Sequence, residues 1–259
     1  MKKPLILISN DDSITAPGIR YLIGIMRKIG QVVVVAPSDP QSAKSHSITI
    51  TTPLKVKTIE KTPEYSEYSL NGTPVDCIKF ALHRLMDRTP DIIVSGINHG
   101  SNASINIIYS GTMAAATEGA MGGIPSIGFS ILDYSEDADF SFAEEYIISI
   151  VNNVISDGLP KKTALNVNFP ISNGKKYNGL KVCRQADGYW KEDFEERLDP
   201  RDGKPYYWLK GDFLLHDKGD DTDEYALRNY YVSMVPVKFD FTDYSNIESL
   251  KSFESKMNF

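Results

Sequence analysis

Cysteine is scarce in this sequence, which has only Cys77 and Cys183 among its 259 residues. The two cysteines stand in no metal-ligand or redox spacing, so the sequence suggests neither a structural zinc site nor a disulfide framework. Both are expected to be core residues.

An excess of basic charge is also missing, because 28 Lys and Arg residues stand against 34 Asp and Glu residues. A protein that neutralises a phosphate backbone needs a broad cationic surface. Long nucleic acid is therefore not an expected partner.

Long apolar runs are absent as well, and no segment reaches membrane-spanning length. The apolar run at residues 5–9 is too short for the core of a secretory leader, and it ends in carboxylates. The expectation is a soluble cytoplasmic protein without membrane contact.

Two common phosphate-binding motifs are missing. No GxxxxGKS or GxxxxGKT motif occurs, and no GxGxxG motif follows the first strand, which argues against a P-loop NTPase and a dinucleotide oxidoreductase. Receiver domains of phosphorelay signalling also hold Mg²⁺ with paired acids, but they need an aspartate at the end of the third strand of the sheet. Ser95 and Asn98 stand there instead.

The sequence does contain a repeated alternation of strand and helix patterns. Apolar runs without polar alternation are typical of parallel strands that helices cover on both faces. They occur at 5–9, 32–37, 91–96, 124–130 and 163–170, and helical patterns occur at 18–30, 75–86, 112–123 and 139–156. This order predicts an α/β fold with a doubly wound, mostly parallel sheet. Segments 46–59 and 64–70 are rich in β-branched and aromatic residues, which predicts an antiparallel insertion.

The C-terminal part has a different character. Residues 175–235 are rich in aromatic residues, which predicts β-hairpins that project from the sheet, and the tail at 240–259 is weakly amphipathic. Exposed aromatic hairpins are typical of subunit interfaces. We expect a core at 1–175, with part of the sheet continuing to about residue 237, and hairpin and oligomerisation elements at 176–259.

The first strand ends on two adjacent aspartates, Asp11 and Asp12. One interpretation is that they cap or turn the chain before a helix that starts near Pro17. The polar groups at neighbouring strand ends favour a second interpretation, because carboxylate, hydroxyl and amide oxygens together suit Mg²⁺, Mn²⁺ or Ca²⁺ and not zinc. A divalent cation would balance the two like charges.

A second signal is the segment Ser110-Gly111-Thr112, which stands directly before a helical run. Glycines in such turns often serve backbone geometry alone. Hydroxyl and backbone N–H groups at a helix N-terminus nevertheless favour an anion. The sequence therefore predicts a phosphate between this helix and the metal.

Six segments together resemble the SurE family of stationary-phase survival proteins. They are SNDD at 9–12, APSDPQSAKSHSIT at 36–49, NGTPVDC at 71–77, VSGINHGSN at 94–102, YSGTMAAATEGAMGGIPSI at 109–127 and LNVNFP at 165–170. The resemblance implies a Rossmann-like fold and divalent-metal-dependent removal of phosphate from nucleoside monophosphates. It also implies a homodimer or homotetramer, for which residues 186–215 and 240–259 are the candidate contacts.

The resemblance also implies roles for individual residues. Asp11, Asp12, Ser42 and Asn98 would bind one divalent metal ion per subunit, Mg²⁺ or Mn²⁺ by preference, with Ca²⁺ an option in crystals. Asn102, Ser110, Gly111 and Thr112 would lie around the phosphate, with Asn10 as a positioning amide. The catalytic set would be Asp12, Asp11 and Asn98, with Asp12 preferred as the group that orients water or accepts its proton.

Three positions depart from the usual family pattern. Ser13 and Ser45 stand where the family usually has glycine, the residue that adopts a positive φ most easily. Asn106 stands where the family usually has an aspartate near the site. His46 lies in the loop that carries Ser42. A lone loop histidine usually completes a hydrogen-bond network, and a role in supporting the metal ligands or donating a proton stays open.

Two other functions stay open at this point. One is a broad acid phosphatase or exopolyphosphatase, and the other is a non-catalytic nucleotide-binding module on the same frame. The residues also leave the preferred nucleotide and the 5′ or 3′ position of its phosphate undecided.

Overall fold

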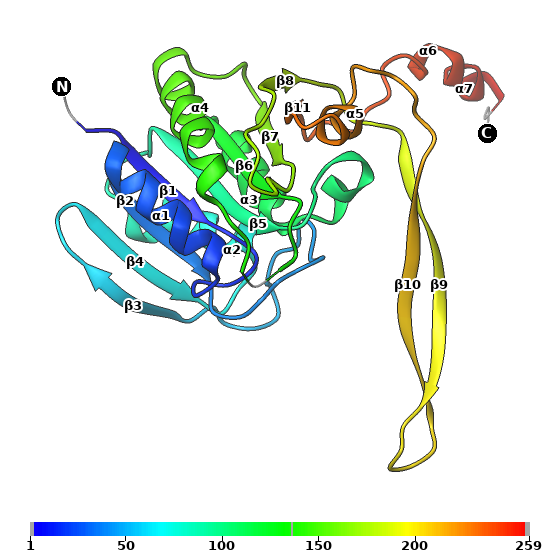
Figure 1. The fold of residues 1–259 in the computed structure, drawn as a ribbon, viewed down its shortest axis with the longest axis horizontal. Helices are drawn as coiled ribbons and strands as arrows, with labels where there is room; N and C mark the ends of the chain where they lie inside the picture. Colours follow the sequence, from blue (N-terminus) through cyan, green and yellow to red (C-terminus); the bar gives the residue numbers. More distant parts are fainter. Residues whose placement is uncertain (1–2, 136, 257–259) are drawn as a thin grey trace.

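The computed structural model describes residues 3–135 and 137–256, and its centre is a nine-stranded sheet (Figure 1). The strand order is β3-β4-β2-β1-β5-β6-β7-β11-β8. The strands are β1 (Leu5–Ser9), β2 (Gln31–Pro37), β3 (Val56–Lys61), β4 (Tyr65–Leu70), β5 (Ile92–His99), β6 (Ser126–Ile131), β7 (Ala164–Phe169), β8 (Leu180–Val182) and β11 (Val232–Val237).

Most of this sheet is parallel, as predicted. The neighbours from β4 to β7 all run in one direction. Strands β3 and β11 run antiparallel to β4 and β7, and β8 pairs parallel with β11. The carboxyl ends of β2, β1 and β5 therefore meet at one edge, where ligands bind in open α/β sheets.

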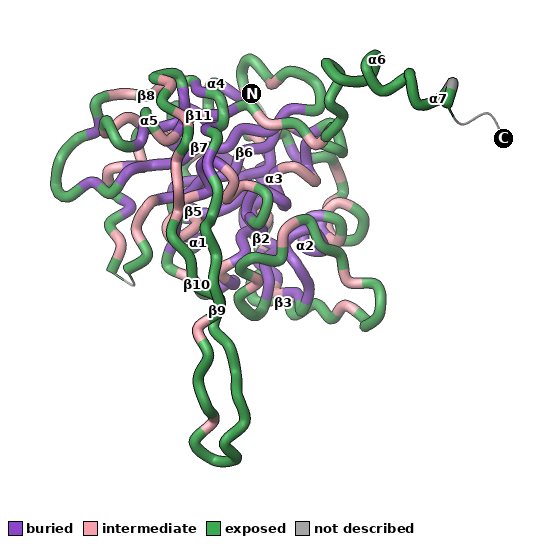
Figure 2. The backbone as a smooth tube through the Cα atoms, turned by 90° about the vertical axis from the view of Figure 1, so that its right-hand side faces the viewer, coloured by how far each residue is buried: buried purple, intermediate pink, exposed green. Residues whose placement is uncertain are grey.

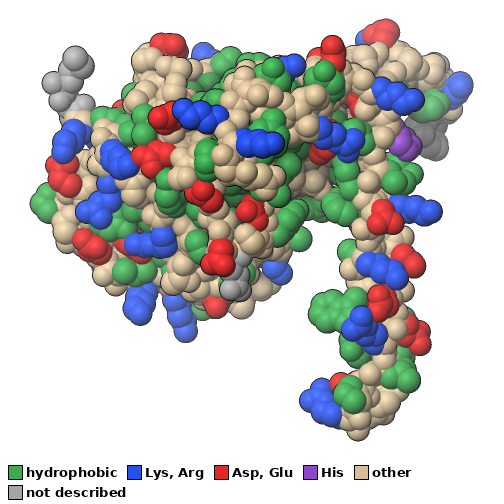
Figure 3. Space-filling model, viewed as in Figure 1, with side chains coloured by type: hydrophobic (Ala, Val, Ile, Leu, Met, Phe, Trp, Pro, Cys, Tyr) green, Lys and Arg blue, Asp and Glu red, His purple; other side chains and the backbone are tan. Residues whose placement is uncertain are grey.

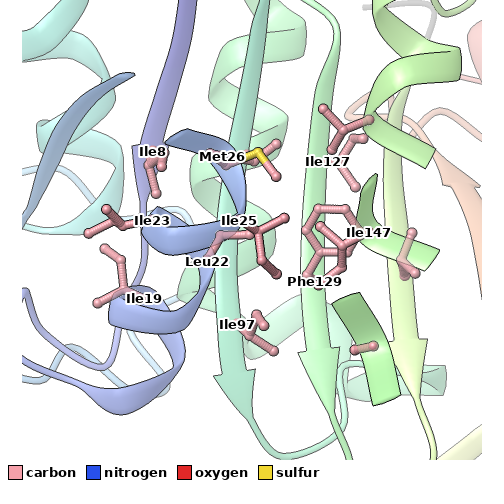
Figure 4. Packing of buried hydrophobic residues seen from close by; sticks show 14 of the residues in the cluster. Ile8, Ile19, Leu22, Ile23, Ile25, Met26, Ile97, Ile127, Phe129 and Ile147 are labelled. Carbon is pink, nitrogen blue, oxygen red and sulfur yellow. The ribbon is translucent and has the colours of Figure 1, made fainter. Parts of the chain in front are cut away.

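Helices cover both faces of the sheet and bury its apolar strands. Side chains of α1 and α4 pack on one face with Ile8, Ile127 and Phe129 (Figure 4), while those of α2 and α3 pack on the other with Leu7 and Ile93. The main α-helices are α1 (Pro17–Ile29), α2 (Pro74–Phe80), α3 (Gly111–Met121), α4 (Glu144–Asp157) and α5 (Asp223–Arg228). The remaining helical segments are η1 (Ala81–Leu85), η2 (Ser104–Tyr109), η3 (Ser141–Ala143), α6 (Ile247–Leu250) and α7 (Ser252–Lys256).

Helix α1 shows how the sequence sets this packing. Pro17 begins the helix at a position where its missing N–H is not needed, and Ile19, Leu22 and Met26 recur at helical spacing on the buried face. A Cβ on Gly18 would lie 1.9 Å from the carbonyl oxygen of Ile97, so only glycine lets α1 approach β5 this closely. The start of α1 is thereby fixed against the strand that carries Asn98.

The prediction of a strand over 46–59 is wrong for its first part. Residues 46–55 form a loop, and strand β3 occupies Val56–Lys61. Side chains satisfy backbone groups of this loop, since the N–H of Thr49 donates to Asp76 Oδ1 at 3.1 Å. Strand β4 is also not part of a separate insertion, because it pairs in parallel with β2 and extends the main sheet.

The C-terminal part contains one long hairpin, where several were predicted. Strands β9 (Gly188–Leu198) and β10 (Pro205–Leu215) pair with each other and project from the body of the molecule (Figures 1 and 2). Strands β8 and β11 join the main sheet instead. Figure 3 shows hydrophobic side chains and charges of both signs along the hairpin, and mixed charges over the face of the body in view.

The tail beyond β11 is exposed and runs away from the body (Figure 2). Its large apolar side chains include Phe241, which is 92% exposed, and residues 257–259 of the predicted tail lie outside the described part. Both cysteines are buried, as expected. Within residues 3–135 and 137–256, no helix combines the length and apolar character needed to cross a membrane.

Candidate active site

Three neighbouring strand ends and the start of one helix meet around Asp11. The backbone N–H of Gln41, in the loop after β2, donates to the Asp11 carbonyl at 2.7 Å. The N–H of His99 at the end of β5 donates to Asp12 Oδ2 at 3.3 Å, and the hydroxyl of Thr112 in α3 donates to Asp11 Oδ1. The loop after β2, the ends of β1 and β5 and the start of α3 are therefore in contact at this edge.

The Asp11 carboxylate is only 4% exposed and lies against the beginning of α3. Burial, together with the adjacent Asp12 carboxylate, raises the pKa of Asp11 to about 6, and the Thr112 hydrogen bond opposes this rise. Burial also raises the pKa of Asp12, against the hydrogen bond from the His99 N–H. The two adjacent anions thus lie in a site that disfavours negative charge unless a cation is added.

No cation of the described chain fills that role, because the ion pairs within residues 3–135 and 137–256 include neither Asp11 nor Asp12. The capping interpretation is also wrong. Helix α1 is capped by Ala16, which makes no side-chain capping bond, and both aspartates precede it.

Asn98 and Asn10 add amide oxygens to the site. The Asn98 Nδ2 donates to the carbonyl of Gly100 at 2.9 Å, which leaves its Oδ1 as the atom available to a ligand. The Asn10 Nδ2 donates to the Ser13 carbonyl at 2.7 Å, while its Oδ1 is buried without a partner. Buried polar atoms are rarely left unpaired, so this oxygen indicates a polar ligand or water nearby.

Ser42 lies in an exposed turn that the chain holds beside Asp11. The turn is closed by the Lys44 N–H, which donates to the Gln41 carbonyl at 3.2 Å, and Gln41 in turn contacts Asp11. The side chain of Ser42 is exposed and makes no contact that fixes it. The structure therefore brings the Ser42 segment to the carboxylates through its backbone.

The start of α3 carries the predicted phosphate-binding residues. Ser110 caps the helix, since its Oγ accepts from the Met113 N–H at 3.0 Å. A Cβ on Gly111 would lie 2.7 Å from the Asp11 Cβ, so the absent side chain lets the helix backbone lie against the carboxylate. Thr112 differs from the prediction in that its hydroxyl proton is directed to Asp11.

A cavity of about 860 Å³ borders Ser110. Its walls are largely apolar and come from η2, α3 and the end of β11, with Ile107, Met113 and Val235 among them. His46 also lines this cavity, and its Nε2 lies 2.9 Å from Glu118 Oε2. The arrangement is a polar edge beside a large apolar hollow.

The donor chemistry fits a divalent metal. Within the described residues, no group of three or more His, Cys, Asp and Glu side chains could hold a metal ion. The available set is two carboxylates with neutral amide and hydroxyl oxygens, which suits hard cations such as Mg²⁺ or Mn²⁺ and does not suit zinc.

The family model described as survival protein SurE matches residues 6–192. The chain belongs to the SurE family. The 5′-nucleotidase SurE of Flavobacterium psychrophilum is 53% identical to it, over 98% of this chain and 99% of its own length. The 5′-nucleotidase SurE of Christiangramia forsetii is 52% identical over 97% of each chain. The crystal structure of the SurE protein from Aquifex aeolicus shares 38% identity and a TM-score of 0.83, covering 97% of this chain and all of the other.

Two departures from the SurE pattern keep the expected backbone. Ser13 has a φ of 92° and Ser45 a φ of 52°, both positive values that glycine adopts without a steric cost. The loops thus have the geometry that the usual glycines favour, with serine in their place. The third departure, Asn106, accepts a hydrogen bond from the indole N–H of Trp190 in the hairpin at 2.7 Å.

The predicted residue Asn102 belongs to a buried amide network with β6 and β7. Its N–H donates to Asn168 Oδ1 and its Nδ2 to Ser130 Oγ, both at 2.8 Å, and Asn166 Nδ2 donates to its carbonyl at 2.8 Å. Asn166 and Asn168 were not predicted as partners of Asn102. The sequence does contain a signal for them, because two asparagines at alternating positions of an otherwise apolar strand point to the same face of the sheet.

Proposed function

We propose that this protein hydrolyses nucleoside monophosphates to nucleoside and phosphate, as a divalent-metal-dependent 5′-nucleotidase. The observation that carries the proposal is the adjacent pair of buried Asp11 and half-buried Asp12 beside the N-terminus of α3, without a balancing cation in the described chain. Membership of the SurE family and the names of its relatives support the same activity.

Asp11, Asp12, Asn98 and Ser42 would hold one metal ion per subunit, with Mg²⁺ or Mn²⁺ preferred for this oxygen set. When bound, such an ion supplies positive charge to the phosphoryl oxygens and lowers the pKa of a water molecule from about 15.7 towards neutrality. We further propose a cytoplasmic homodimer or homotetramer that assembles through residues 186–215 and 240–259.

The remaining chemistry belongs to the chain. Asp11 is fixed by Thr112 and serves as a ligand, while the more accessible Asp12 orients the attacking water and accepts its proton. The Ser110 hydroxyl and the first N–H groups of α3 bind phosphoryl oxygens as their charge shifts in the transition state. The apolar cavity beside Ser110 gives the nucleoside room while the phosphate stays at the polar edge.

The first experiment is phosphate release from a panel of nucleoside monophosphates, an aryl phosphate and polyphosphate, with EDTA and then with Mg²⁺ or Mn²⁺ restored. We expect metal-dependent release that favours the nucleotides. Equal release from the aryl phosphate or polyphosphate would instead support the broad phosphatase or exopolyphosphatase. If nucleotides bind but no phosphate is released with any metal, the result would support the non-catalytic nucleotide-binding module.

Asp12→Asn tests the catalytic assignment directly. We expect it to lower kcat by at least about a thousandfold with circular dichroism unchanged, since water activation is lost. Asp39→Asn is the matched control, because Asp39 is an exposed acid of the loop after β2 whose side chain accepts a hydrogen bond from the Ser38 hydroxyl. Near-normal turnover of Asp12→Asn at saturating metal would refute the assignment.

A further inference from the structure

The loop that carries Ser42, residues 38–49, is tied to several elements and is here called the Ser42 loop. Its residue Ser45 donates through N–H to the Tyr109 carbonyl at 3.1 Å and through Oγ to the Ile108 carbonyl at 2.6 Å. Its far end is held near α2, because Thr73 Oγ1 donates to the Ser47 carbonyl at 2.7 Å. These bonds fix the backbone, while His46 supplies a side-chain tie.

That side-chain tie ends on Glu118, in the second turn of α3. Glu118 is 11% exposed, and its two oxygens contact different segments. Oε2 lies 2.9 Å from His46 Nε2 in the Ser42 loop, and Oε1 lies 2.5 Å from Lys79 Nζ in α2. Burial alone would raise the pKa of Glu118, but the hydrogen bonds from His46 and Lys79 lower it overall, so the group is an anion that accepts from both.

Helix α3 therefore holds two parts of the proposed metal site at once. Near its N-terminus, Thr112 fixes Asp11, and six residues later Glu118 fixes the Ser42 loop. A helix rises about 1.5 Å per residue, so these two attachment points lie about 9 Å apart along a rigid rod. Beside the backbone bond from the Gln41 N–H to the Asp11 carbonyl, the bonds of Glu118 thus add a second, side-chain constraint on the position of the Ser42 loop.

We propose that Glu118 is a positioning residue that anchors the Ser42 loop to α3 and α2, so that the oxygen ligands are already arranged when the metal binds. The statement about the metal rests on the function proposed above. Glu118 touches neither the reacting atoms nor the carboxylates, and it acts through His46 and the loop.

The test compares Glu118→Gln with Glu144→Gln. Glu144 is a matched control because it also accepts from two side chains of another helix, Tyr21 at 2.9 Å and Lys28 at 2.5 Å, at a place outside the Ser42 loop and α3. Hydrogen–deuterium exchange on the metal-free protein should show at least about tenfold faster exchange over residues 38–49 in Glu118→Gln only, because the amide cannot accept from both partners with full charge.

Direct Mn²⁺ titration gives a second readout. We expect Glu118→Gln to bind Mn²⁺ about tenfold more weakly, while kcat at saturating Mn²⁺ stays within about threefold of the wild type. His46→Ala should share the defect, and His46→Asn should recover part of the affinity because its amide retains an N–H donor.

Two results would overturn the proposal. One is unchanged loop exchange and Mn²⁺ affinity in a folded Glu118→Gln. The other is a loss of kcat at saturating Mn²⁺ on nucleotides but not on p-nitrophenyl phosphate, whose good leaving group needs no proton, since that pattern assigns His46 and Glu118 to proton transfer.

Failure of the proposed function would be recognised separately. If the wild type releases no phosphate from any substrate, loop exchange and Mn²⁺ titration still decide the role of Glu118. If Glu118→Gln does not fold, His46→Ala and Lys79→Met carry the same measurements, because each removes one partner of the carboxylate.

Discussion

Asp11 combines burial, an adjacent anion and a single hydroxyl donor, and this combination makes the metal-free protein sensitive to pH. Its pKa of about 6 in the folded chain lies above the ordinary value of 3.8. Between these two values the folded chain binds more protons at this site than the unfolded chain. The free energy of unfolding therefore falls as the pH rises from about 4 to about 6.

Asp11→Asn should remove this fall. In EDTA at pH 7 we expect the free energy of unfolding of the variant to exceed that of the wild type by roughly 2 kcal/mol. Each pH unit between the two pKa values corresponds to about 1.4 kcal/mol, and the weaker hydrogen bond from Thr112 to the amide cancels part of this gain. Urea denaturation at pH 4.5 and pH 7 measures the difference, with Asp39→Asn as control. Equal pH slopes in Asp11→Asn and the wild type would contradict the argument.

Ser13 offers a second test at the scale of one residue. Its φ of 92° is costly for a side chain with a Cβ, so Ser13→Gly should raise the free energy of unfolding by about 1 kcal/mol. Ser149→Gly in the exposed middle of α4 should act in the opposite direction, by about 0.5 kcal/mol. A loss of stability in Ser13→Gly would show that its contact with Thr15 outweighs the backbone strain.

Residue types predicted part of the site and not all of it. The paired aspartates and the residues around Ser110 were identifiable because their chemistry is unusual at strand ends and helix starts. The link from Glu118 to His46 spans 72 residues of sequence and resembles an ordinary surface charge until the fold brings the two together. The hydrogen bond from Thr112 to Asp11 likewise could not be predicted, because it depends on the close approach of α3 to the end of β1 in the folded chain.

At the scale of single elements, α3 needs glycine at its first position. Gly111→Ala places a Cβ within 3 Å of Asp11 and should displace the carboxylate. We expect Mn²⁺ affinity to fall at least tenfold, measured by direct titration. Gly24→Ala in α1 is the control, because apart from the adjacent residues and the backbone of α1 itself no atom lies within 4 Å of a Cβ there. It should leave binding unchanged while stabilising the helix by up to about 1 kcal/mol.

The elements themselves were predictable where one pattern dominated. Apolar runs such as 5–9 and 91–96 became central strands because both faces are covered. Residues 46–55 are rich in β-branched residues and were therefore predicted to form a strand. They form a loop instead, in which Asp76 accepts from the Thr49 N–H and Thr73 donates to the Ser47 carbonyl. A β-branched segment forms a strand only when a neighbouring strand accepts and donates its backbone hydrogen bonds. In this segment, side chains bind backbone groups instead.

At the scale of the whole molecule, the projecting hairpin predicts assembly. Its side chains Phe194, Trp208 and Leu209 are each more than half exposed, and such apolar surfaces are usually buried against a partner. Sedimentation velocity should show a species heavier than the 28.9 kDa chain. Replacing residues 189–214 with a short glycine linker should reduce its mass, and an unchanged mass would exclude the hairpin as the main contact.

The order of the strands has a consequence for biosynthesis. The first five strands made, β1 to β5, occupy five neighbouring places in the sheet, and β6 and β7 add beyond β5. Every proposed ligand of the metal and phosphate, together with Glu118, lies before residue 119. Because synthesis runs from the N-terminus, the segments that carry these residues leave the ribosome before β6 and β7.

The segments proposed for assembly, 186–215 and 240–259, are made after strands β1 to β7. The residues of the proposed ligand-binding edge are therefore all made before the segments proposed for assembly. If those segments form the contact between subunits, chains on neighbouring ribosomes can pair only after strands β1 to β7 of each chain have been made.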